Sequence, residues 1–301
     1  MGSGTGKRYP VTPRNEKAFL CALQNTKSYK DRFSESYVYS LEPESRKRIG
    51  ASSLTFHQQP KAIGTSVYTA AIAGSKLLEH AFGGTEPKID GEHIIELGSG
   101  TGITGIVAAT LGANMILTDI QGTVLDNLRV NVDTNSGYCP TKPTVAAFDW
   151  RESFSSLEKR VSKNSLQSLS GILAMEVIYY SECVDPLINT LLNLTGGKGD
   201  SKLACTAFDE QKTLEEICDS FPTLNSSLCR HWPKKLKGQH MEPSVLLGFD
   251  TRGREGVRNF LAKIQKWFDV TVIPSSLQHL HFVCDHVRFV ILERKACKEE
   301  M

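Results

Sequence analysis

The sequence is short of the features that would mark a membrane protein, a disulfide-stabilised protein or a binder of nucleic acid. No segment approaches the roughly 18 uninterrupted apolar residues that a membrane-spanning helix needs. The 301 residues include 8 cysteines, but none form a C-x-x-C pair and no signal peptide leads the chain, which favours reduced thiols in the cytoplasm or nucleus. The 35 Lys and Arg nearly balance the 33 Asp and Glu, so a net charge of +2 creates no field that would recruit nucleic acid or an acidic membrane.

Signatures of hydrolases and of metal sites are missing as well. The sequence contains no G-x-S-x-G nucleophile elbow, and no cysteine pairs with a histidine in a recognised catalytic order. One cluster of potential metal ligands, H-x-H-x-x-C-D-H, runs from His279 to His286. It matches no standard zinc spacing and falls in a turn region where polar residues are expected. We therefore expect no metal site.

The apolar content is sufficient for one large domain with a small extension. Hydrophobic residues make up 40% of the chain, which predicts a substantial core. Strand-like patterns over 36–42 and 51–59 flank the charged residues 43–48 and predict an N-terminal β-hairpin closed by a turn. We therefore divide the chain into an N-terminal extension over residues 1–62 and a main domain over residues 63–301.

Apolar strands alternate with amphipathic helices through the main domain. This order predicts an α/β fold with a doubly wound, mostly parallel, seven-stranded Rossmann-like sheet and right-handed crossovers. A helix over 66–80 covers the sheet, a fifth strand is predicted over 202–209, and an insertion follows at about 210–250. The last two strands, FDVTVIP and VRFVILERK, have no helix between them and must form an antiparallel pair. The other elements are strands at about 93–98, 114–119, 144–150 and 171–179, with helices at about 102–111, 121–135 and 152–163.

A glycine-rich turn joins the first strand of the main domain to the helix that follows it. Gly98, Gly100 and Gly102 permit positive φ and let a ligand approach bare backbone, beside the free N–H groups of the helix start. The pattern is G-x-G-x-G with Glu96 two residues before it, rather than the G-x-G-x-x-G that holds a dinucleotide pyrophosphate. Because a carboxylate would repel phosphate and attract a cation, the turn predicts a nucleotide-like ligand with a cationic part.

Acidic and aromatic residues stand at the ends of the next three strands. Asp119 follows the glycines by about 20 residues, where an acid can bind both ribose hydroxyls. Asp149 could accept an exocyclic amine, and the neighbouring Trp150 could face a purine ring. Glu176 and Tyr179 end the fourth strand. Because ligands bind at the carboxyl ends of strands in open α/β sheets, these residues predict a single pocket.

The motifs ELGSGTG, DW and MEVIYY resemble those of the seven-strand S-adenosylmethionine-dependent methyltransferases, specifically their non-histone protein-lysine methyltransferase branch, methyltransferase family 16. The resemblance covers roughly residues 36–295, with an interruption near 210–250. Tyr68 stands where the branch usually has Trp, and Glu176 where it usually has Asp. The resemblance implies S-adenosyl-L-methionine as cofactor and Glu176 and Tyr179 as catalytic residues. Together with the turn, it gives the predicted cofactor-binding set Tyr68, Glu96, Gly98, Ser99, Gly100, Thr101, Gly102, Asp119, Ile120, Asp149, Trp150 and Met175.

Methylation of a lysine requires its amine to lose a proton first. A free lysine has a pKa near 10.4, so fewer than about one molecule in a thousand is neutral at pH 7. We expect Glu176 to align the amine and to accept or relay its proton, although an ionised Glu176 also stabilises the ammonium form. Tyr179 is expected to wall a narrow lysine channel. Tyr180 is expected to point to the opposite face of the strand.

Two other functions would use the same cofactor residues. A small-molecule methyltransferase would need a lidded pocket, and the insertion at about 210–250 could be that lid. A non-catalytic interaction module would bind S-adenosylmethionine and transfer nothing. The acid-x-x-Tyr pattern favours the protein-lysine enzyme. The resemblance to the branch implies a chaperone, an ATPase or a translation factor as its substrate. We expect a cytoplasmic or nuclear monomer that binds a protein substrate and neither nucleic acid nor membrane.

Overall fold

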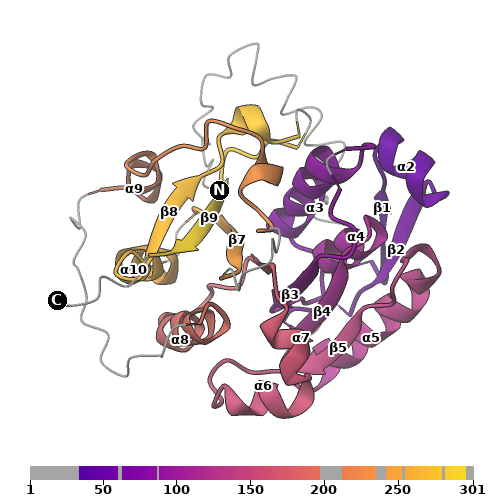
Figure 1. The fold of residues 1–301 in the computed structure, drawn as a ribbon, viewed down its shortest axis with the longest axis horizontal. Helices are drawn as coiled ribbons and strands as arrows, with labels where there is room; N and C mark the ends of the chain where they lie inside the picture. Colours follow the sequence, from indigo (N-terminus) through magenta and orange to yellow (C-terminus); the bar gives the residue numbers. More distant parts are fainter. Residues whose placement is uncertain are drawn as a thin grey trace, which may run out of the picture.

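The predicted seven-stranded sheet forms the centre of the fold (Figure 1). The structure, a computed structural model, describes residues 34–59, 63–86, 88–196, 212–234, 242–252, 255–279 and 282–295. The strand order is β5-β4-β3-β6-β7-β9-β8, in which β9 is antiparallel to both neighbours and all other pairs are parallel. This confirms the predicted fold class. The strands are β3 (His93–Leu97), β4 (Asn114–Asp119), β5 (Thr144–Ala147), β6 (Gly171–Met175), β7 (Ser244–Asp250), β8 (Phe268–Val272) and β9 (Val287–Arg294).

The strand order reverses between β3 and β6, which lie side by side in the middle of the sheet. From β3 the chain builds outward through β4 to β5, and from β6 it builds in the opposite direction through β7. Crossovers that diverge in this way leave a crevice at the carboxyl ends of the two central strands. The sheet therefore provides a ligand site next to the glycine-rich turn that follows β3.

Helices cover both faces of the sheet, and each face has its own hydrophobic core. Helices α3, α4 and α5 pack on one face, and α6 to α10 pack on the other. Each helix packs on the sheet because its apolar residues share one face. In α10, for example, these residues recur at helical spacing and are fully buried: Val257, Phe260, Leu261 and Ile264. The helices are α2 (Pro43–Ile49), α3 (Thr69–Phe82), α4 (Ile103–Thr110), α5 (Thr123–Asn135), α6 (Ser155–Arg160), α7 (Lys163–Gln167), α8 (Val184–Leu194), α9 (Leu214–Asp219) and α10 (Glu255–Ile264), with 3₁₀ turns at Ser136–Tyr138, Ser181–Cys183, Leu228–Arg230 and Ser275–Leu277.

The strand beside β6 is not the one that the sequence predicts. Residues 202–209, predicted as the fifth strand, lie outside the described residues. β7 occupies that position instead, although the prediction placed its residues, Ser244–Asp250, inside the insertion. Every residue of β7 is buried, as expected for a parallel strand covered on both faces. The sequence offers two apolar runs of similar length in this part of the chain, and the structure pairs the second of them, Ser244–Asp250, with β6.

The strands that carry the predicted site residues are shorter than predicted. β5 ends at Ala147 rather than at 150, and β6 ends at Met175 rather than at 179. Asp149 and Glu176 therefore lie on the loops that leave the sheet. Side chains on these loops are not bound by the alternation of a strand, so neighbouring residues can face the same side.

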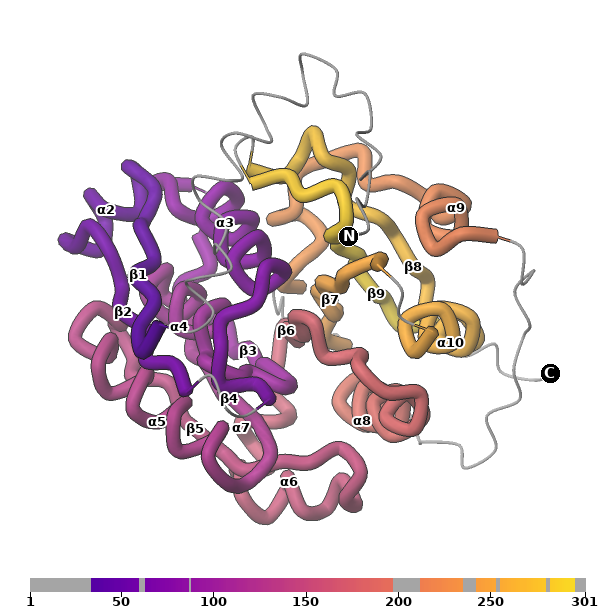
Figure 2. Tube along the Cα trace, turned by 180° about the vertical axis from the view of Figure 1, so that it is seen from behind, coloured from indigo at the N-terminus to yellow at the C-terminus, as the bar shows by residue number. Residues whose placement is uncertain are grey.

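The N-terminal hairpin is present, but its connection is a helix. β1 (Ser36–Ser40) and β2 (Ser53–His57) pair antiparallel, as predicted. The segment between them, predicted as a turn, forms α2, which begins at Pro43 and ends at Ile49, followed by Gly50 in the left-handed conformation. The two-stranded sheet lies beside α5 in both views (Figures 1 and 2). Asn131 of α5 fixes it there by accepting a 2.6 Å hydrogen bond from the His57 backbone N–H and donating to its carbonyl.

A buried network of charges joins the hairpin to α3. Lys76 of α3 is only 3% exposed and donates to Glu42 at 2.5 Å and to Glu79 at 3.0 Å. Tyr39 of β1 donates to the same Glu79 at 2.5 Å. His279 Nε2 lies 3.2 Å from the Glu42 carboxylate. Each charge has a partner of opposite sign or a hydrogen-bond donor, which offsets the cost of burying it.

Loss of the Glu42 charge should destabilise the fold in a pH-dependent way. The hydrogen bond from His279, followed by that from Lys76, lowers the Glu42 pKa from 4.5 to about 2. A carboxylate whose pKa is lower in the folded state stabilises the fold above its unfolded pKa, and this contribution is lost as the pH falls from about 4.5 to about 2. We expect Glu42→Gln to reduce the free energy of unfolding by about 1–2 kcal/mol at pH 6, after allowance for solvent screening, and by less at pH 3.

Urea titrations of the wild type and Glu42→Gln at both pH values measure this difference. The control is Glu44→Gln, because Glu44 is an exposed acid on the neighbouring helix whose partner is the exposed Lys47. An equal loss of stability at pH 6 and pH 3 would show that the Glu42 charge does not contribute.

Among the described residues, no helix combines the length and the apolar character needed to cross a membrane. Within the same ranges, no three or more His, Cys, Asp or Glu side chains gather into a potential metal site.

Candidate active site

A cavity of about 230 Å³ lies at the carboxyl ends of β3, β4 and β6, next to the start of α3. It occupies the crevice where the strand order reverses. The structure brings most of the predicted site residues together here, from five separate segments of the chain. Those that line the cavity are Tyr68, Gly98, Ser99, Gly100, Thr101, Asp119, Ile120, Asp149, Trp150, Met175 and Tyr179.

The glycine-rich turn needs its first two glycines for both conformation and space. Gly98 has a φ of 62°, and a Cβ atom there would lie 2.9 Å from a methyl group of Val177 and 3.1 Å from the Trp150 ring. Gly100 has a φ of 57°, and its Cβ would lie 2.9 Å from the Gly64 carbonyl oxygen. Any other residue would strain the backbone and push these neighbours apart. The turn therefore presents bare backbone to the cavity, as predicted.

Asp119 is held in a fixed orientation at the end of β4. Its Oδ2 accepts a 2.7 Å hydrogen bond from the Gly100 N–H, and its Oδ1 accepts one of 2.8 Å from the Ile120 N–H. Burial raises the pKa of Asp119, while the two N–H donors oppose that rise. A carboxylate oxygen has more than one lone pair, so both can still accept ribose hydroxyls.

Asp149 already has a partner in this structure. Arg151 donates to it from Nη2 at 2.6 Å and from Nε and its backbone N–H at 2.9 Å. These hydrogen bonds hold the pKa of Asp149 below its ordinary value. An exocyclic amine would have to share the Asp149 carboxylate with the guanidinium, which the prediction did not include.

Two tyrosine rings meet at the cavity. The Tyr68 and Tyr179 ring centroids lie 6.2 Å apart with an interplanar angle of 61°. Tyr68 precedes α3, and Tyr179 lies on the loop after β6. Aromatic faces attract cations, so the pair suits an alkylammonium side chain.

Glu176 adopts an unusual backbone conformation beside the cavity. It has a φ of 58° and is the only described residue other than glycine with positive φ. Such a conformation is strained for a side chain with a Cβ atom and is concentrated at functional sites. The Glu176 N–H donates to the Gly248 carbonyl of β7 at 2.7 Å, which anchors the loop.

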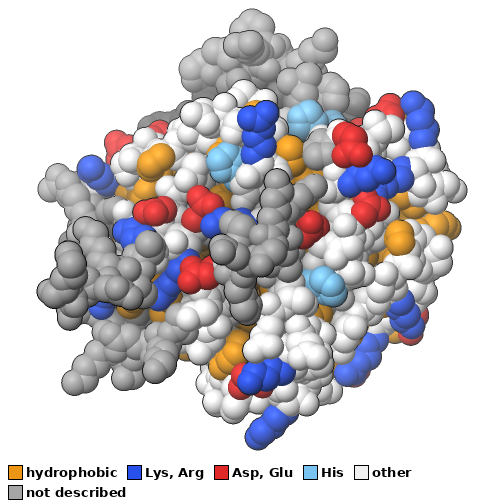
Figure 3. Space-filling view, in the orientation of Figure 1, with side chains coloured by type: hydrophobic (Ala, Val, Ile, Leu, Met, Phe, Trp, Pro, Cys, Tyr) orange, Lys and Arg blue, Asp and Glu red, His pale blue; other side chains and the backbone are white. Residues whose placement is uncertain are grey.

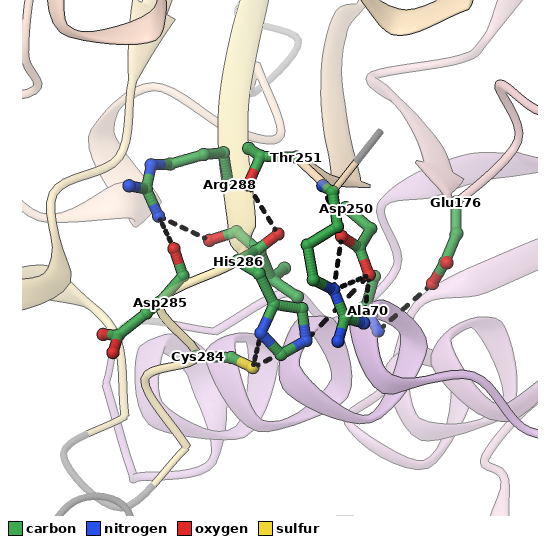
Figure 4. Close-up of polar contacts among 10 residues, drawn as sticks. Ala70, Glu176, Asp250, Thr251, Cys284, Asp285, His286 and Arg288 are labelled. Atoms are coloured by element: carbon green, nitrogen blue, oxygen red, sulfur yellow. Dashed lines mark hydrogen bonds and ion pairs between the residues drawn. The ribbon is translucent and has the colours of Figure 1, made fainter. Parts of the chain in front are cut away.

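The Glu176 carboxylate reaches the first turn of α3. Its Oε2 accepts a 3.4 Å hydrogen bond from the Ala70 N–H (Figure 4). The start of a helix favours a negative charge. This contact uses the full length of the glutamate, one methylene more than the aspartate that is usual in the resembling branch. Glu176 does not line the cavity, but Met175 and Val177 on either side of it do.

Glu96 and Gly102 do not line the cavity. Glu96 is buried with its Oε2 close to Gly105 of α4, and that oxygen has no hydrogen-bond partner among the described residues. Burial raises the pKa of Glu96 to about 8, so the group is mostly protonated at neutral pH. Without a ligand, burial therefore disfavours the negative charge by which Glu96 was expected to repel phosphate. Gly102 precedes α4 with a φ of 81°, and a Cβ there would lie 2.4 Å from Leu128, so glycine is required by both conformation and packing.

Several residues of the cavity were missed. Tyr180 was expected to face away from the site, but it lines the cavity because β6 has already ended at Met175. The segment before α3 also contributes, and its glycine was the only local signal of a close approach. The other unpredicted lining residues are Ile63, Gly64, Ser66, Ala71, Arg151, Val177 and Cys183.

Comparison with known proteins identifies the family. A family model described as lysine methyltransferase matches residues 50–216, more than half of the chain. The protein belongs to this family. The match confirms the predicted family of methyltransferases, and S-adenosylmethionine is the cofactor of that class.

Curated relatives are similar over about half of the chain. Protein N-lysine methyltransferase METTL21A of Danio rerio is 33% identical over 156 residues, which cover 49% of this chain and 64% of that protein. Protein-lysine methyltransferase METTL21E of Mus musculus is 31% identical, covering 48% and 61%. EEF1A lysine methyltransferase 3 of Xenopus tropicalis is 30% identical, covering 46% and 58%. The chain thus spans about three fifths of the length of the relatives it matches.

Proposed function

We propose that this protein transfers a methyl group from S-adenosylmethionine to the ε-amine of a lysine in a non-histone protein of the chaperone, ATPase or translation-factor class. The observation that carries the proposal is the position of Glu176. A buried carboxylate in a strained backbone conformation lies beside a cavity walled by the Tyr68 and Tyr179 rings. Membership of the lysine methyltransferase family supports the same reaction.

The residues of the cavity fit the proposed cofactor. Asp119 offers a fixed carboxylate for ribose hydroxyls, and Trp150 offers an aromatic face for a purine ring. Gly98 and Gly100 leave a cradle that any Cβ atom would fill. When bound, S-adenosylmethionine supplies a methyl group on a cationic sulfur.

The chain's own residues prepare the lysine for this transfer. The Tyr68 and Tyr179 rings attract the ammonium and hold the side chain in line. Glu176 accepts hydrogen bonds from the nitrogen, fixes its direction, and receives or relays the proton that leaves. Burial removes water from the nitrogen and disfavours the charged ammonium, which supports deprotonation.

The mouth of the cavity supports a protein as the substrate. Ile63, Ile120 and Tyr180 line the cavity yet are 66%, 42% and 53% exposed, and they are three of the six large apolar side chains that are exposed in the described part of the chain. Exposed apolar side chains gathered in one place mark a surface that another molecule covers. We call Ile63, Ile120 and Tyr180 the rim of the cavity. A macromolecule that inserts one lysine into the cavity would cover this rim.

We expect Tyr180→Ala to raise the KM for the protein substrate by about tenfold, as for a tyrosine at an interface, with a smaller effect on kcat. The control is Tyr138→Ala, because Tyr138 is a comparably exposed tyrosine, 42%, in the 3₁₀ turn after α5. Steady-state methylation kinetics separate the two constants. An unchanged KM in Tyr180→Ala would remove the rim from the account of substrate binding.

Labelled-methyl transfer into a cell lysate tests the proposal directly. The wild-type protein and S-adenosylmethionine labelled in the methyl group should label a protein band, in which mass spectrometry finds a methylated lysine. Label that enters only small molecules would favour a small-molecule methyltransferase. No transfer, with cofactor binding retained, would favour a non-catalytic binding module.

We further propose that the protein acts as a monomer in the cytoplasm or nucleus and binds neither nucleic acid nor membrane. The near balance of charged residues supports the expectation that it binds neither nucleic acid nor membrane. On the face shown in Figure 3, basic and acidic side chains are interspersed rather than gathered into a patch of one sign.

A further inference from the structure

A second pair of charged residues lies one strand away from Glu176. Asp250 ends β7, and only 8% of its side chain is exposed. Arg252 donates two parallel hydrogen bonds to this carboxylate, from Nη2 to Oδ2 at 2.6 Å and from Nε to Oδ1 at 3.1 Å. Its backbone N–H adds a third, of 2.8 Å, to Oδ1. This geometry fixes the position of the guanidinium although most of its side chain faces solvent.

The pair belongs to the same end of the sheet as Glu176. β6 and β7 are neighbours, and the Glu176 N–H donates to Gly248, two residues before Asp250. The hydrogen bonds to Asp250 raise the pKa of Arg252, and the negative charge of Glu176 adds a smaller rise in the same direction. Figure 4 shows Glu176 and Asp250 above the same first turn of α3.

Two further titratable groups face Arg252, from the segment before β9. His286 lies 3.9 Å from Asp250, and its pKa is lowered by burial and then by the charge of Arg252. Cys284 lies 3.3 Å from the His286 ring, and burial raises its pKa to about 11. Near neutral pH the thiol is therefore uncharged. The charged groups at this corner are Arg252, Asp250 and Glu176, together with Asp285 and Arg288, which also act on His286.

A fixed positive charge at this place would offset an unfavourable effect of Glu176 on the target lysine. Glu176 must hold the lysine nitrogen, but its negative charge also stabilises the unreactive ammonium. A positive charge nearby opposes this effect. Arginine is suited to the task because it stays protonated at any pH at which the enzyme works.

We propose that Arg252, held in place by Asp250, is a positioning residue whose positive charge favours the neutral, reactive form of the target lysine at Glu176. The inference rests on the proposed function, because it concerns the lysine that this function places in the cavity. The Asp250 carboxylate moderates the charge of Arg252, so the two members of the pair act on the lysine in opposite directions.

The pH dependence of methyl transfer tests this assignment. The single-turnover rate of labelling should be measured from pH 6.5 to 10, on the protein band that the wild type labels in a lysate. The wild-type rate should rise with pH until the bound lysine is neutral. Arg252→Gln should move this rising limb to higher pH by about half a unit or more, because it removes a positive charge and leaves Asp250. Asp250→Asn should move it to lower pH.

Both variants break the same ion pair, so a purely structural role of the pair would affect them alike. Shifts of opposite sign therefore identify the two charges as the cause. Arg252→Lys should stay close to the wild-type profile, since it keeps the charge. Arg288→Gln is the matched control: Arg288 belongs to the same corner but lies on the far side of His286 from Glu176 in Figure 4, and it should leave the profile unchanged.

Three outcomes would overturn the inference. Shifts in the same direction, unshifted limbs, or rates lowered equally at every pH in both variants would show that the pair only supports the loop. In each case wild-type labelling would still stand, and with it the proposed function. Absence of any labelling by the wild type would overturn both. Thermal melting identifies a variant that does not fold. The direction in which the other variant shifts the pH–rate profile then tests the inference.

Discussion

Glu176→Gln should lower the turnover of methyl transfer by about 10²-fold or more, the effect typical of losing a general base. Glutamine keeps the size of the side chain and can still accept the hydrogen bond from the Ala70 N–H at the start of α3. It lacks the negative charge that would hold the lysine nitrogen and receive its proton. Affinity for S-adenosylmethionine should barely change, because the cofactor is assigned to Asp119, Trp150 and the glycine-rich turn rather than to Glu176.

Radiometric turnover and calorimetric titration of the cofactor separate these two effects. Glu182→Gln provides the control, because Glu182 is an exposed acid in the 3₁₀ turn just after the site. Full activity in Glu176→Gln would remove the assigned role of the carboxylate. A large loss of cofactor affinity would instead mean that Glu176 supports the pocket rather than the reaction.

Asp119→Ala should weaken cofactor binding by at least about 10²-fold. Two hydrogen bonds to ribose hydroxyls would be lost, each worth on the order of 1.5–3 kcal/mol when charge-assisted. The substitution also removes the acceptor of the Gly100 N–H, so the glycine-rich turn loses one of its anchors. Both effects act on the same ligand site.

Calorimetry with S-adenosylmethionine and S-adenosylhomocysteine measures the loss. Asp126→Ala is the matched control, because Asp126 is an exposed acid of α5 that pairs only weakly with Arg129 on the surface. Unchanged affinity in Asp119→Ala would place the ribose elsewhere.

Local patterns predicted which residues the structure gathers around the cavity. A glycine turn between a strand and a helix, with acids after neighbouring strands, is specified within short stretches of sequence. The structure gathers Gly98, Asp119 and Trp150 around one cavity, as that pattern requires. The topology of open α/β sheets then brings these residues together, because the carboxyl ends of the strands that carry them lie at one edge of the sheet.

Features that depend on strand pairing and on the burial of side chains could not be predicted from the sequence. β7 was misplaced because two apolar runs could each have paired with β6, and pairing is decided between distant parts of the chain. Glu96 was interpreted as a charged group, but its burial beneath α4 leaves it mostly protonated at neutral pH. The Asp250–Arg252 pair escaped notice for the same reason, because its strand had been assigned to the insertion.

The central claim is that the target is one lysine of a folded protein. Its most direct test is methyl transfer from labelled S-adenosylmethionine to the purified protein identified from the lysate, beside the same protein with the modified lysine replaced by arginine. The account predicts that the wild-type substrate is labelled, that the arginine variant is not, and that Glu176→Gln enzyme labels neither above background. Equal labelling of both substrates, or label confined to small molecules, would contradict it.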